Sequence, residues 1–197
     1  MLLLLGMSNE VVLDIETQNT FQDIGSRDTD QLKISVVGVY TYRDDQFRIY
    51  TEKELPLLWS VLEHADRIIG YNHRSFDMPV LNNYYSGDCT RFPLLDMIEE
   101  ATDALGYRPK LDDLAFGTLK TRKSGHGLDA VRYWQTGEIE KLKKYCLDDV
   151  RITRDLYAYG RKNGQIIYAQ TFGAPRVISV DFSPSVVKQK KNLTLGF

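Results

Sequence analysis

A chain of 197 residues with 27 acidic and 25 basic side chains has a formal charge of only −2, which excludes a globally basic surface and restricts any nucleic-acid contact to a local patch. The length favours one domain with a sizeable core, and 43% hydrophobic and 26% charged residues are ordinary for a globular protein. The two cysteines, Cys89 and Cys146, have no CxxC partner, so the sequence carries neither a zinc signature nor a disulfide framework and fits a reducing cytoplasm.

The two ends of the chain differ from its middle. Leucines fill positions 2–5, but this run is shorter than the ~7–15 residues of a signal-peptide core or the ~18 of a membrane span. We therefore interpret residues 1–9 as a disordered leader, with Met7 as an alternative start, and expect no membrane association. Residues 10–182 are predicted to form a single domain, and the lysine-rich residues 183–197 a basic tail.

The hydrophobic pattern predicts strands and helices along the chain. Strands are predicted from residue 11 and at 32–42, 47–50, 67–71 and 92–95, and a terminal hairpin at 166–172 and 176–181. Helices are predicted at 52–64, 76–85, 96–105, 110–119, 128–135 and 137–159. A loop is predicted at 21–31, where polar residues surround a glycine.

The order of these elements predicts an α/β fold with a central mixed β-sheet. The first three strands follow one another closely, which indicates a three-strand antiparallel meander. The strands that arrive after a helix indicate parallel crossovers. Helices are expected to flank the sheet, and a C-terminal β-hairpin to follow the long helix.

The first predicted strand carries two acidic residues on one face. After the apolar run VVL, Asp14 and Glu16 are separated by Ile15, and alternate residues of a strand project on the same side. Two like charges in a core require a positive partner, and Mg²⁺ or Mn²⁺ suits hard oxygen ligands. The alternative is a strand that ends in a solvated acidic turn.

The long predicted helix places another acid in an apolar stripe. At 100° per residue, Asp149 falls within the core-facing side of the helix, whereas Asp148 lies towards the polar flank. Tyr145 lies one turn earlier on the same side as Asp149. The alternative to a metal ligand is a structural salt bridge between Asp149 and an arginine such as Arg67 or Arg132.

Asp77 points into the apolar face of the helix predicted at 76–85, where Pro79 is tolerated in the first turn. Here the alternative is that Asp77 is only a helix N-cap. Four acids that converge on one place would repel one another unless divalent metal neutralised them. Such a cluster is the arrangement that two-metal phosphoryl chemistry needs.

Three spaced motifs in this sequence resemble those of the DEDD (DnaQ-like) 3′→5′ exonucleases of the ribonuclease H-like fold. DIE at 14–16 resembles the first motif, GYNHRSFDMPVL at 70–81 the second, and YCLDD at 145–149 the third. The third motif is that of the tyrosine-bearing (DEDDy) branch, because Lys144 stands where the other branch has histidine. The segment 123–157 is also similar to uncharacterised bacterial and phage members of this branch, some of them fused to helicases.

The resemblance implies a ribonuclease H-like fold and two divalent ions, Mg²⁺ or Mn²⁺, as cofactors. Asp14 is expected to bridge both ions, with Glu16 and Asp149 completing the first site. Asp77 is expected to hold the second ion, partly through water. Tyr145 is expected to orient the attacking water, since a tyrosine that titrates near ~10 is a poor base at neutral pH; the alternative is a packed core tyrosine.

Several residues near the second motif are predicted to contact a single nucleic-acid strand. Asn72 is expected to bond to a sugar or base, and Phe76 to stack on a base unless it is a helix-core residue. Thr17 is expected to help position the turn after the first motif. His73, in contrast, is interpreted as a solvated loop residue.

A glycine-flanked basic loop is the other candidate contact with the strand. It contains Lys120, Arg122, Lys123 and His126, and contacts with phosphates are predicted for this loop, with Lys123 and His126 as the residues assigned to nucleic-acid binding. The alternative is an ordinary solvated loop.

The function expected from these residues is metal-dependent 3′→5′ exonucleolysis of single-stranded DNA or RNA, with release of nucleoside 5′-monophosphates. One alternative is a catalytically weak nucleic-acid-binding module of a repair or replication assembly, although the sequence keeps all four acids and the tyrosine. Another is a ribonuclease H-type endonuclease or resolvase. A helicase, polymerase or repair partner and a cytoplasmic location are expected, and the sequence leaves the oligomeric state and the choice of DNA or RNA open.

Overall fold

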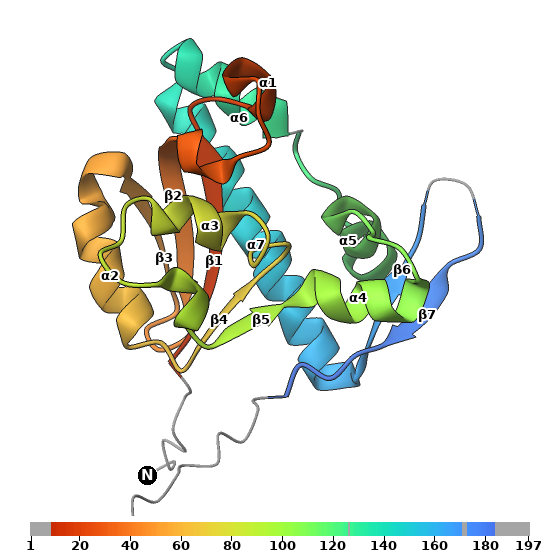
Figure 1. The fold of residues 1–197 in the computed structure, drawn as a ribbon. Coiled ribbons are helices and arrows are strands. Elements are labelled where there is room, and N and C mark those ends of the chain that lie inside the picture. Colours follow the sequence, from red (N-terminus) through yellow and green to blue (C-terminus); the bar gives the residue numbers. More distant parts are fainter. Residues whose placement is uncertain (1–8, 126, 171–172, 184–197) are drawn as a thin grey trace, which may run out of the picture.

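A five-stranded mixed sheet forms the centre of the molecule (Figure 1). The computed structural model describes residues 9–125, 127–170 and 173–183. The strand order β3-β2-β1-β4-β5 places β1 in the middle. The five strands are β1 (Glu10–Thr17), β2 (Ile34–Thr41), β3 (Gln46–Thr51), β4 (Arg67–Gly70) and β5 (Leu94–Asp96).

The strand directions bring three carboxyl-terminal strand ends to one edge of the sheet. β1, β2 and β3 pair antiparallel, whereas β4 pairs parallel with β1, and β5 parallel with β4. The predicted meander joined to parallel strands is therefore confirmed. Because the last residues of β1, β4 and β5 lie at the same edge, acids at the ends of these strands and the loops that follow them are brought together.

Helices cover both faces of the sheet (Figure 1). Among the residues that the structure describes, the α-helices are α1 (Phe21–Ile24), α2 (Leu55–Glu63), α3 (Asp77–Asn82), α4 (Met97–Leu105), α5 (Leu111–Leu119), α6 (Gly127–Gln135) and α7 (Ile139–Asn163). Short 3₁₀ helices occupy Thr29–Gln31, Glu52–Glu54 and Cys89–Arg91. No helix in the described ranges is long and apolar enough to cross a membrane.

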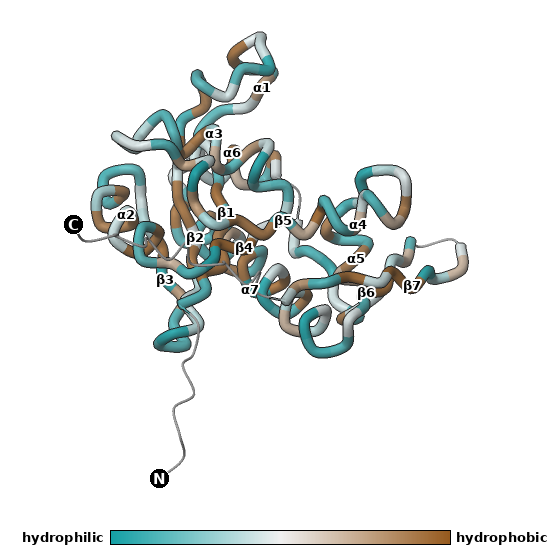
Figure 2. The backbone as a smooth tube through the Cα atoms, turned by 60° about the horizontal axis from the view of Figure 1, so that its bottom comes forward, coloured by the Kyte–Doolittle hydropathy of each residue, from teal (hydrophilic) through white to brown (hydrophobic). Residues whose placement is uncertain are grey.

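The alternation of β1 decides which side chains meet which helices. Val11 and Leu13 pack with residues of α2 and α3 on one face, whereas Val12 packs with Val150 of α7 on the other. Figure 2 shows the apolar character of these central strands. Since side chains two residues apart share a face, the even-numbered acids of β1 also project towards α7.

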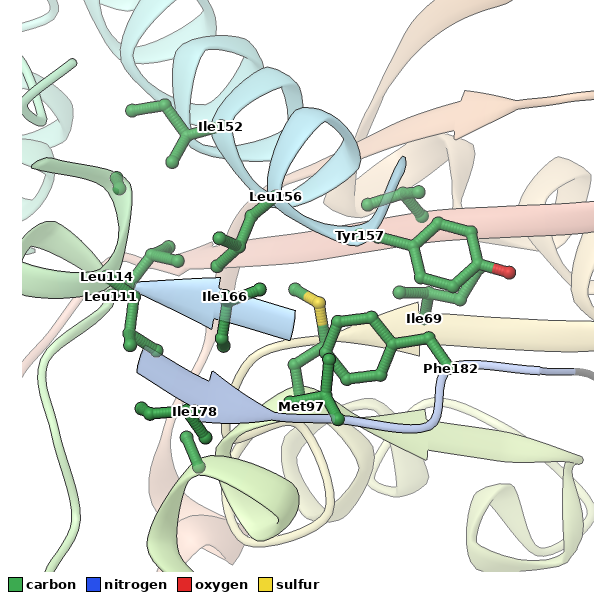
Figure 3. Close-up of a cluster of buried hydrophobic side chains, with 14 of the residues drawn as sticks. Ile69, Met97, Leu111, Leu114, Ile152, Leu156, Tyr157, Ile166, Ile178 and Phe182 are labelled. Carbon is green, nitrogen blue, oxygen red and sulfur yellow. The ribbon is translucent and has the colours of Figure 1, made fainter. Parts of the chain in front are cut away.

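The C-terminal hairpin adds a second apolar layer beside the sheet. β6 (Gln165–Tyr168) and β7 (Arg176–Ser179) pair antiparallel, which confirms the predicted hairpin. Ile166 and Ile178 join a buried cluster with side chains from α4, α5 and α7 (Figure 3). The hairpin thereby braces α5 and α7, two of the helices that carry residues of the candidate site.

Several predicted boundaries differ from the structure, most clearly at the loop predicted for 21–31 and in the first strand of the terminal hairpin. The segment 21–31 was expected to be a loop, but it contains α1 and a 3₁₀ helix. Thr20 and Asp23 form a capping box at the start of α1, and Gly25 ends it in the left-handed conformation with φ of 63°; these local bonds stabilise a single turn that lacks a buried face. The first hairpin strand was predicted to reach 172, but β6 ends at Tyr168, and positions 171–172 lie outside the described residues.

A buried ionic cluster closes the end of the sheet where β1 begins. Glu10 is 1% exposed and accepts hydrogen bonds from Arg67 (2.7 Å), Tyr157 (2.9 Å) and Arg161 (2.7 Å). Arg67 also donates to the carbonyl oxygen of Ser183 at 2.7 Å. This cluster, which we call the Glu10 cluster, joins the start of β1 to α7 and to the last described residues.

Candidate metal centre

β1 presents Asp14 and Glu16 to α7, as its alternation requires. The Oδ2 atom of Asp14 is buried and has no hydrogen-bond partner among the described residues. Ligand atoms of Asp14, Glu16 and Cys146 all lie within 4.8 Å of one another. These two acids therefore lie side by side, with Glu16 buried and Asp14 half-buried, and not in a solvated turn.

α7 contributes the third acid from the opposite side. Asp149 is 2% exposed, and its Oδ1 atom is buried without a hydrogen-bond partner in the part of the chain that is described. Tyr145, one turn earlier, is 4% exposed, and its hydroxyl group likewise lacks such a partner. Buried oxygens are rarely left unpaired in a native protein, so this arrangement indicates a place for a cation and an ordered water.

Asp77, the first residue of α3, is the fourth acid of the cluster. Its Oδ1 atom accepts a hydrogen bond from the backbone N–H of Ile15 at 3.1 Å, between the two acids of β1. Phe76 occupies the cap position of α3. The alternative that Asp77 is only a helix N-cap is therefore wrong, because its side chain bonds across to the central strand.

The electrostatics of these acids are those of a site with more negative than positive charge. Burial, followed by the charges of neighbouring acids, raises the pKa of Asp14 and of Glu16 well above the usual values. Burial also raises the pKa of Asp77 to about 7 and raises that of Asp149. Divalent cations favour the charged forms of such ligands, so the donor set fits hard metal ions such as Mg²⁺ or Mn²⁺.

A lysine is the positive partner that the structure itself supplies. Lys123 Nζ lies 2.5 Å from Asp149 Oδ2, and its charge also opposes the raised pKa values of Asp14 and Glu16. The two arginines that were considered as partners of Asp149 pair with other acids. Arg67 belongs to the Glu10 cluster, and Arg132 pairs with Asp129. The alternative of an arginine partner for Asp149 is wrong, because packing brings Lys123, on the loop after α5, against α7.

Asp112 of α5 holds the loop that carries this lysine. One of its carboxylate oxygens accepts from the backbone N–H of Lys123 at 2.8 Å, and the other pairs with Arg122 at 2.6 Å. Arg122 also lies over the ring of Phe116, 4.0 Å from its centroid. His126, the other predicted phosphate contact in this loop, lies outside the described residues.

The neighbouring acid Asp148 has a different environment from Asp149. It pairs with Lys144 and with Arg151, both at 2.6 Å, on the outer side of α7. Burial is the largest single effect and raises the pKa of Asp148, but the hydrogen bonds and charges of Lys144 and Arg151 together outweigh it, so the pKa is lowered. The helical geometry that assigned Asp148 to the polar flank is therefore confirmed.

The loop after β4 has an unusual backbone at Asn72. This residue has φ of 67°, and its N–H donates to Asp96 Oδ1 at 2.6 Å. Asp96 Oδ2 accepts from the N–H of Arg74 at 3.0 Å, so one buried acid at the end of β5 fixes the loop. The Asn72 side chain accepts a hydrogen bond from Arg108.

Sequence reasoning missed Asp96 and Arg108. Asp96 had a usable signal, since Leu94-Leu95-Asp96 repeats the pattern of an apolar strand that ends in an acid. Arg108 had none, because its place depends on how the loop after α4 packs. His73 was misassigned: it is completely buried, packs against Gly70, and burial lowers its pKa to about 3.

Two hollows adjoin the acids. The larger, of about 860 Å³, is lined by residues of the loops after β4, α4 and α5, among them Asn72, Arg108 and Lys123. The smaller, of about 340 Å³, is lined by Glu16, Thr17 and apolar side chains that include Phe76. Phe76 is half-buried there, and Thr17 donates to the Asn19 carbonyl at 2.8 Å within the turn after β1.

Residues 11–160 match the family model of the RNase_H superfamily, and the chain belongs to that superfamily. The match covers all four acids of the cluster and Tyr145. A sequence comparison with curated proteins finds no match.

Solved structures share the fold at low sequence identity. The family B DNA polymerase of the hyperthermophilic archaeon Pyrobaculum calidifontis is similar with a TM-score of 0.59 and 19% identity over 79% of this chain and 25% of the polymerase. Trypanosoma brucei RNase D gives 0.56 and 17% over 77% of this chain and 57% of that one, and its complex with RNA U12 gives 0.58 and 16% over 77% and 55%. The chain thus spans a quarter of the polymerase and just over half of RNase D. The predicted ribonuclease H-like fold is confirmed.

Proposed function

We propose that this protein is a metal-dependent 3′→5′ exonuclease that removes nucleoside 5′-monophosphates from single-stranded DNA or RNA. The observation that carries the proposal is the convergence of four acids from three elements, two of them with unpartnered buried oxygens: Asp14, Glu16, Asp77 and Asp149. Membership of the RNase_H superfamily supports nuclease chemistry. The complex of Trypanosoma brucei RNase D with RNA U12 supports a nucleic-acid ligand.

The four acids would hold the divalent ions, Mg²⁺ or Mn²⁺. When bound, such ions activate water for attack on phosphorus and offset the charge that develops on the leaving oxygen. The chain itself contributes ligand placement. β1 fixes Asp14 and Glu16 on one face, and the hydrogen bond from Ile15 orients Asp77.

Tyr145 would orient the attacking water. Burial and the charges of the nearby acids raise the pKa of its hydroxyl group, so the group stays protonated at neutral pH and acts as a hydrogen-bond donor, not as a base. The hydroxyl group also interacts with the carboxylate of Asp149, whose pKa it lowers, so it lies beside the ligands where the attacking water would be held.

Lys123 is assigned to the scissile phosphate. Its side chain is 25% exposed and lines the larger hollow while its Nζ atom contacts Asp149. The ammonium group of Lys123 thus lies between the buried acids and the larger hollow. At this position its charge attracts a phosphate.

The test is digestion of single-stranded oligonucleotides labelled at the 5′ end. With Mn²⁺ or Mg²⁺ we expect a ladder that shortens from the 3′ end and stops at a 3′ phosphorothioate block, for DNA, RNA or both. A circular single strand should remain intact. Opening of the circle would instead establish an endonuclease, and binding without any cleavage would establish a nucleic-acid-binding module.

A further inference from the structure

The two hollows beside the acids have opposite chemistry. The larger is lined by four cations and two acids: Arg108, Lys110, Arg122, Lys123, Asp112 and Asp113. The smaller contains no cation among its described lining residues, and opposite Glu16 and the polar turn after β1 it has apolar side chains, among them Phe21, Phe76 and Leu128. The rings of Phe21 and Phe76 meet edge to face at 6.0 Å. The larger hollow reaches the acids through Lys123, and the smaller through Glu16.

A strand that is shortened from its 3′ end has a matching asymmetry. Its terminal nucleoside carries no phosphate beyond the scissile one, whereas the remaining strand carries one phosphate per nucleotide. The terminal base is therefore suited to the apolar hollow, where aromatic rings can stack on it. The polyanionic remainder is suited to the cationic hollow, whose volume of about 860 Å³ is within the range of about 300–1,000 Å³ for ligand sites.

Among the cations that line the larger hollow, Arg108 is held in place by a hydrogen bond and has no ion pair with a described residue, so its charge is available to a phosphate. Arg122 and Lys123 are already paired with Asp112 and Asp149, but Arg108 forms no ion pair with any residue that the structure describes. Its guanidinium group donates to the neutral amide oxygen of Asn72. This bond restricts the side chain without neutralising it, and leaves further N–H donors of the planar fork for two phosphate oxygens.

The support of Arg108 extends to the end of β5. Asn72 can face Arg108 because its backbone adopts a left-handed φ of 67°, and Asp96 fixes that conformation by accepting from the N–H groups of Asn72 and Arg74. Asp96 is 2% exposed, so this anchor is part of the core. The side-chain oxygen of Asn72, a residue that the sequence suggested as a sugar or base contact, holds Arg108.

We infer that the larger hollow is the subsite for the nucleotide on the 5′ side of the scissile bond, with Arg108 binding its phosphate and Asn72 and Asp96 as positioning residues. The inference rests on the proposed function. The strand that remains after cleavage would then lie against the loops that follow β4, α4 and α5.

A comparison of two substrates distinguishes an effect on binding at this subsite from an effect on the chemical step. The p-nitrophenyl ester of thymidine 5′-monophosphate has a terminal nucleoside and a scissile phosphate but no nucleotide on the leaving side, whereas oligothymidylate has both. For Arg108→Ala, the ratio of kcat/KM for the oligonucleotide to that for the ester should fall about tenfold, mainly through KM, as expected for loss of a charge-assisted hydrogen bond. The slope of log KM against log salt should decrease by about 0.7.

Two variants control the measurement. Arg91→Ala removes another exposed arginine, from the 3₁₀ helix at Cys89–Arg91, and should leave the ratio unchanged. Asn72→Gly keeps the left-handed backbone accessible but removes the amide; it should lower the ratio by a smaller factor, and add no further loss to Arg108→Ala.

The outcomes distinguish this inference from the proposed function. If the wild-type protein hydrolyses both substrates and Arg108→Ala lowers kcat/KM for both by the same factor, or for neither, the subsite is wrong and the exonuclease stands. If the wild-type protein hydrolyses neither substrate with Mn²⁺ or Mg²⁺, the proposed function fails, and the subsite fails with it.

Discussion

In the metal-free protein, the surroundings of Asp14 disfavour the charged form of its carboxyl group. Burial raises its pKa, and Glu16, Asp149 and Asp77 raise it further. Functional residues that are placed against the electrostatic preference of the fold commonly reduce stability. Asp14 should therefore affect catalysis and metal-free stability in opposite directions.

Asp14→Asn should lower nuclease activity by at least about 100-fold, because it removes the ligand expected between the two ions. It should also raise the Tm of the metal-free protein by ~2–4 °C, since a neutral amide no longer repels the other acids. Digestion assays and thermal unfolding in a chelator measure the two effects. Asp148→Asn is the matched control, and equal loss of activity in that variant would mean that the wrong aspartate of the adjacent pair has been assigned.

Tyr145→Phe should lower kcat by about 10- to 100-fold with little change in KM, because it removes one hydrogen bond to water and no substrate contact. The ring stays, so packing against Lys123, whose Nζ lies 5.7 Å from the ring centroid, is kept. Steady-state kinetics with an oligonucleotide measure both constants. Wild-type turnover would reduce Tyr145 to a packed core tyrosine.

At the scale of elements, the distance between β1 and α7 depends on a glycine in the neighbouring strand. Gly38 of β2 pairs with Asp14 and faces α7 so closely that an added Cβ would lie 2.7 Å from Cys146 Sγ and 2.9 Å from Val150 Cγ2. No side chain fits there unless the side chains of Cys146 and Val150, or the helix that carries them, move. The close approach of Asp149 to the acids of β1 thus depends on Gly38, which belongs to neither β1 nor α7.

Gly38→Ala should destabilise the protein by ~1–3 kcal/mol through overpacking and should weaken Mn²⁺ binding by moving Asp149 away from Asp14. Denaturant unfolding and metal titration by calorimetry measure these effects. Gly127→Ala is the matched control for stability, since its Cβ would meet no atom within 4 Å. Normal Mn²⁺ affinity in Gly38→Ala would show that the helix can shift without opening the cluster.

The elements also explain which parts of the site were predictable. Asp14, Asp77 and Asp149 each interrupt an apolar pattern, so periodicity alone marked them as buried acids. The partner of Asp149 was not predictable, because Lys123 arrives on a loop whose path is set by Asp112. His73 was misjudged for a related reason, since no local pattern reveals that its loop folds back over Gly70.

At the scale of the whole molecule, the acids link stability to pH and metal. Asp77 has its folded pKa raised to about 7, above the usual 3.8 expected in the unfolded chain. Its folded form therefore binds more protons, and its contribution to stability is present at low pH and lost as pH rises through 7. The raised pKa values of Asp14 and Glu16 act in the same direction.

The free energy of unfolding of the metal-free protein should accordingly decrease between about pH 6.5 and 8.5, and saturating Mn²⁺ should reverse this trend because the deprotonated ligands bind the ion. Chemical unfolding across this range, with and without Mn²⁺, measures the difference. His73 has the opposite effect at lower pH. Burial lowers its pKa from 6.5 to about 3, so His73 reduces the stability of the fold as the pH falls below 6.5. The window from about pH 6.5 to 8.5 lies above that range. A Mn²⁺ effect that does not grow with pH would contradict the assignment of these acids as ligands.

The Glu10 cluster has a consequence for how the protein can be handled. Glu10 and Glu16 are separated by six residue steps along β1, or about 20 Å of extended strand, and Arg67 binds both Glu10 and the Ser183 carbonyl. Both ends of the described fold therefore leave the sheet opposite the acids (Figure 1). A surface anchor attached through either end would leave the metal centre facing solution, and a short peptide joining the two ends would permit a circular permutant with new termini at the exposed turn between β2 and β3.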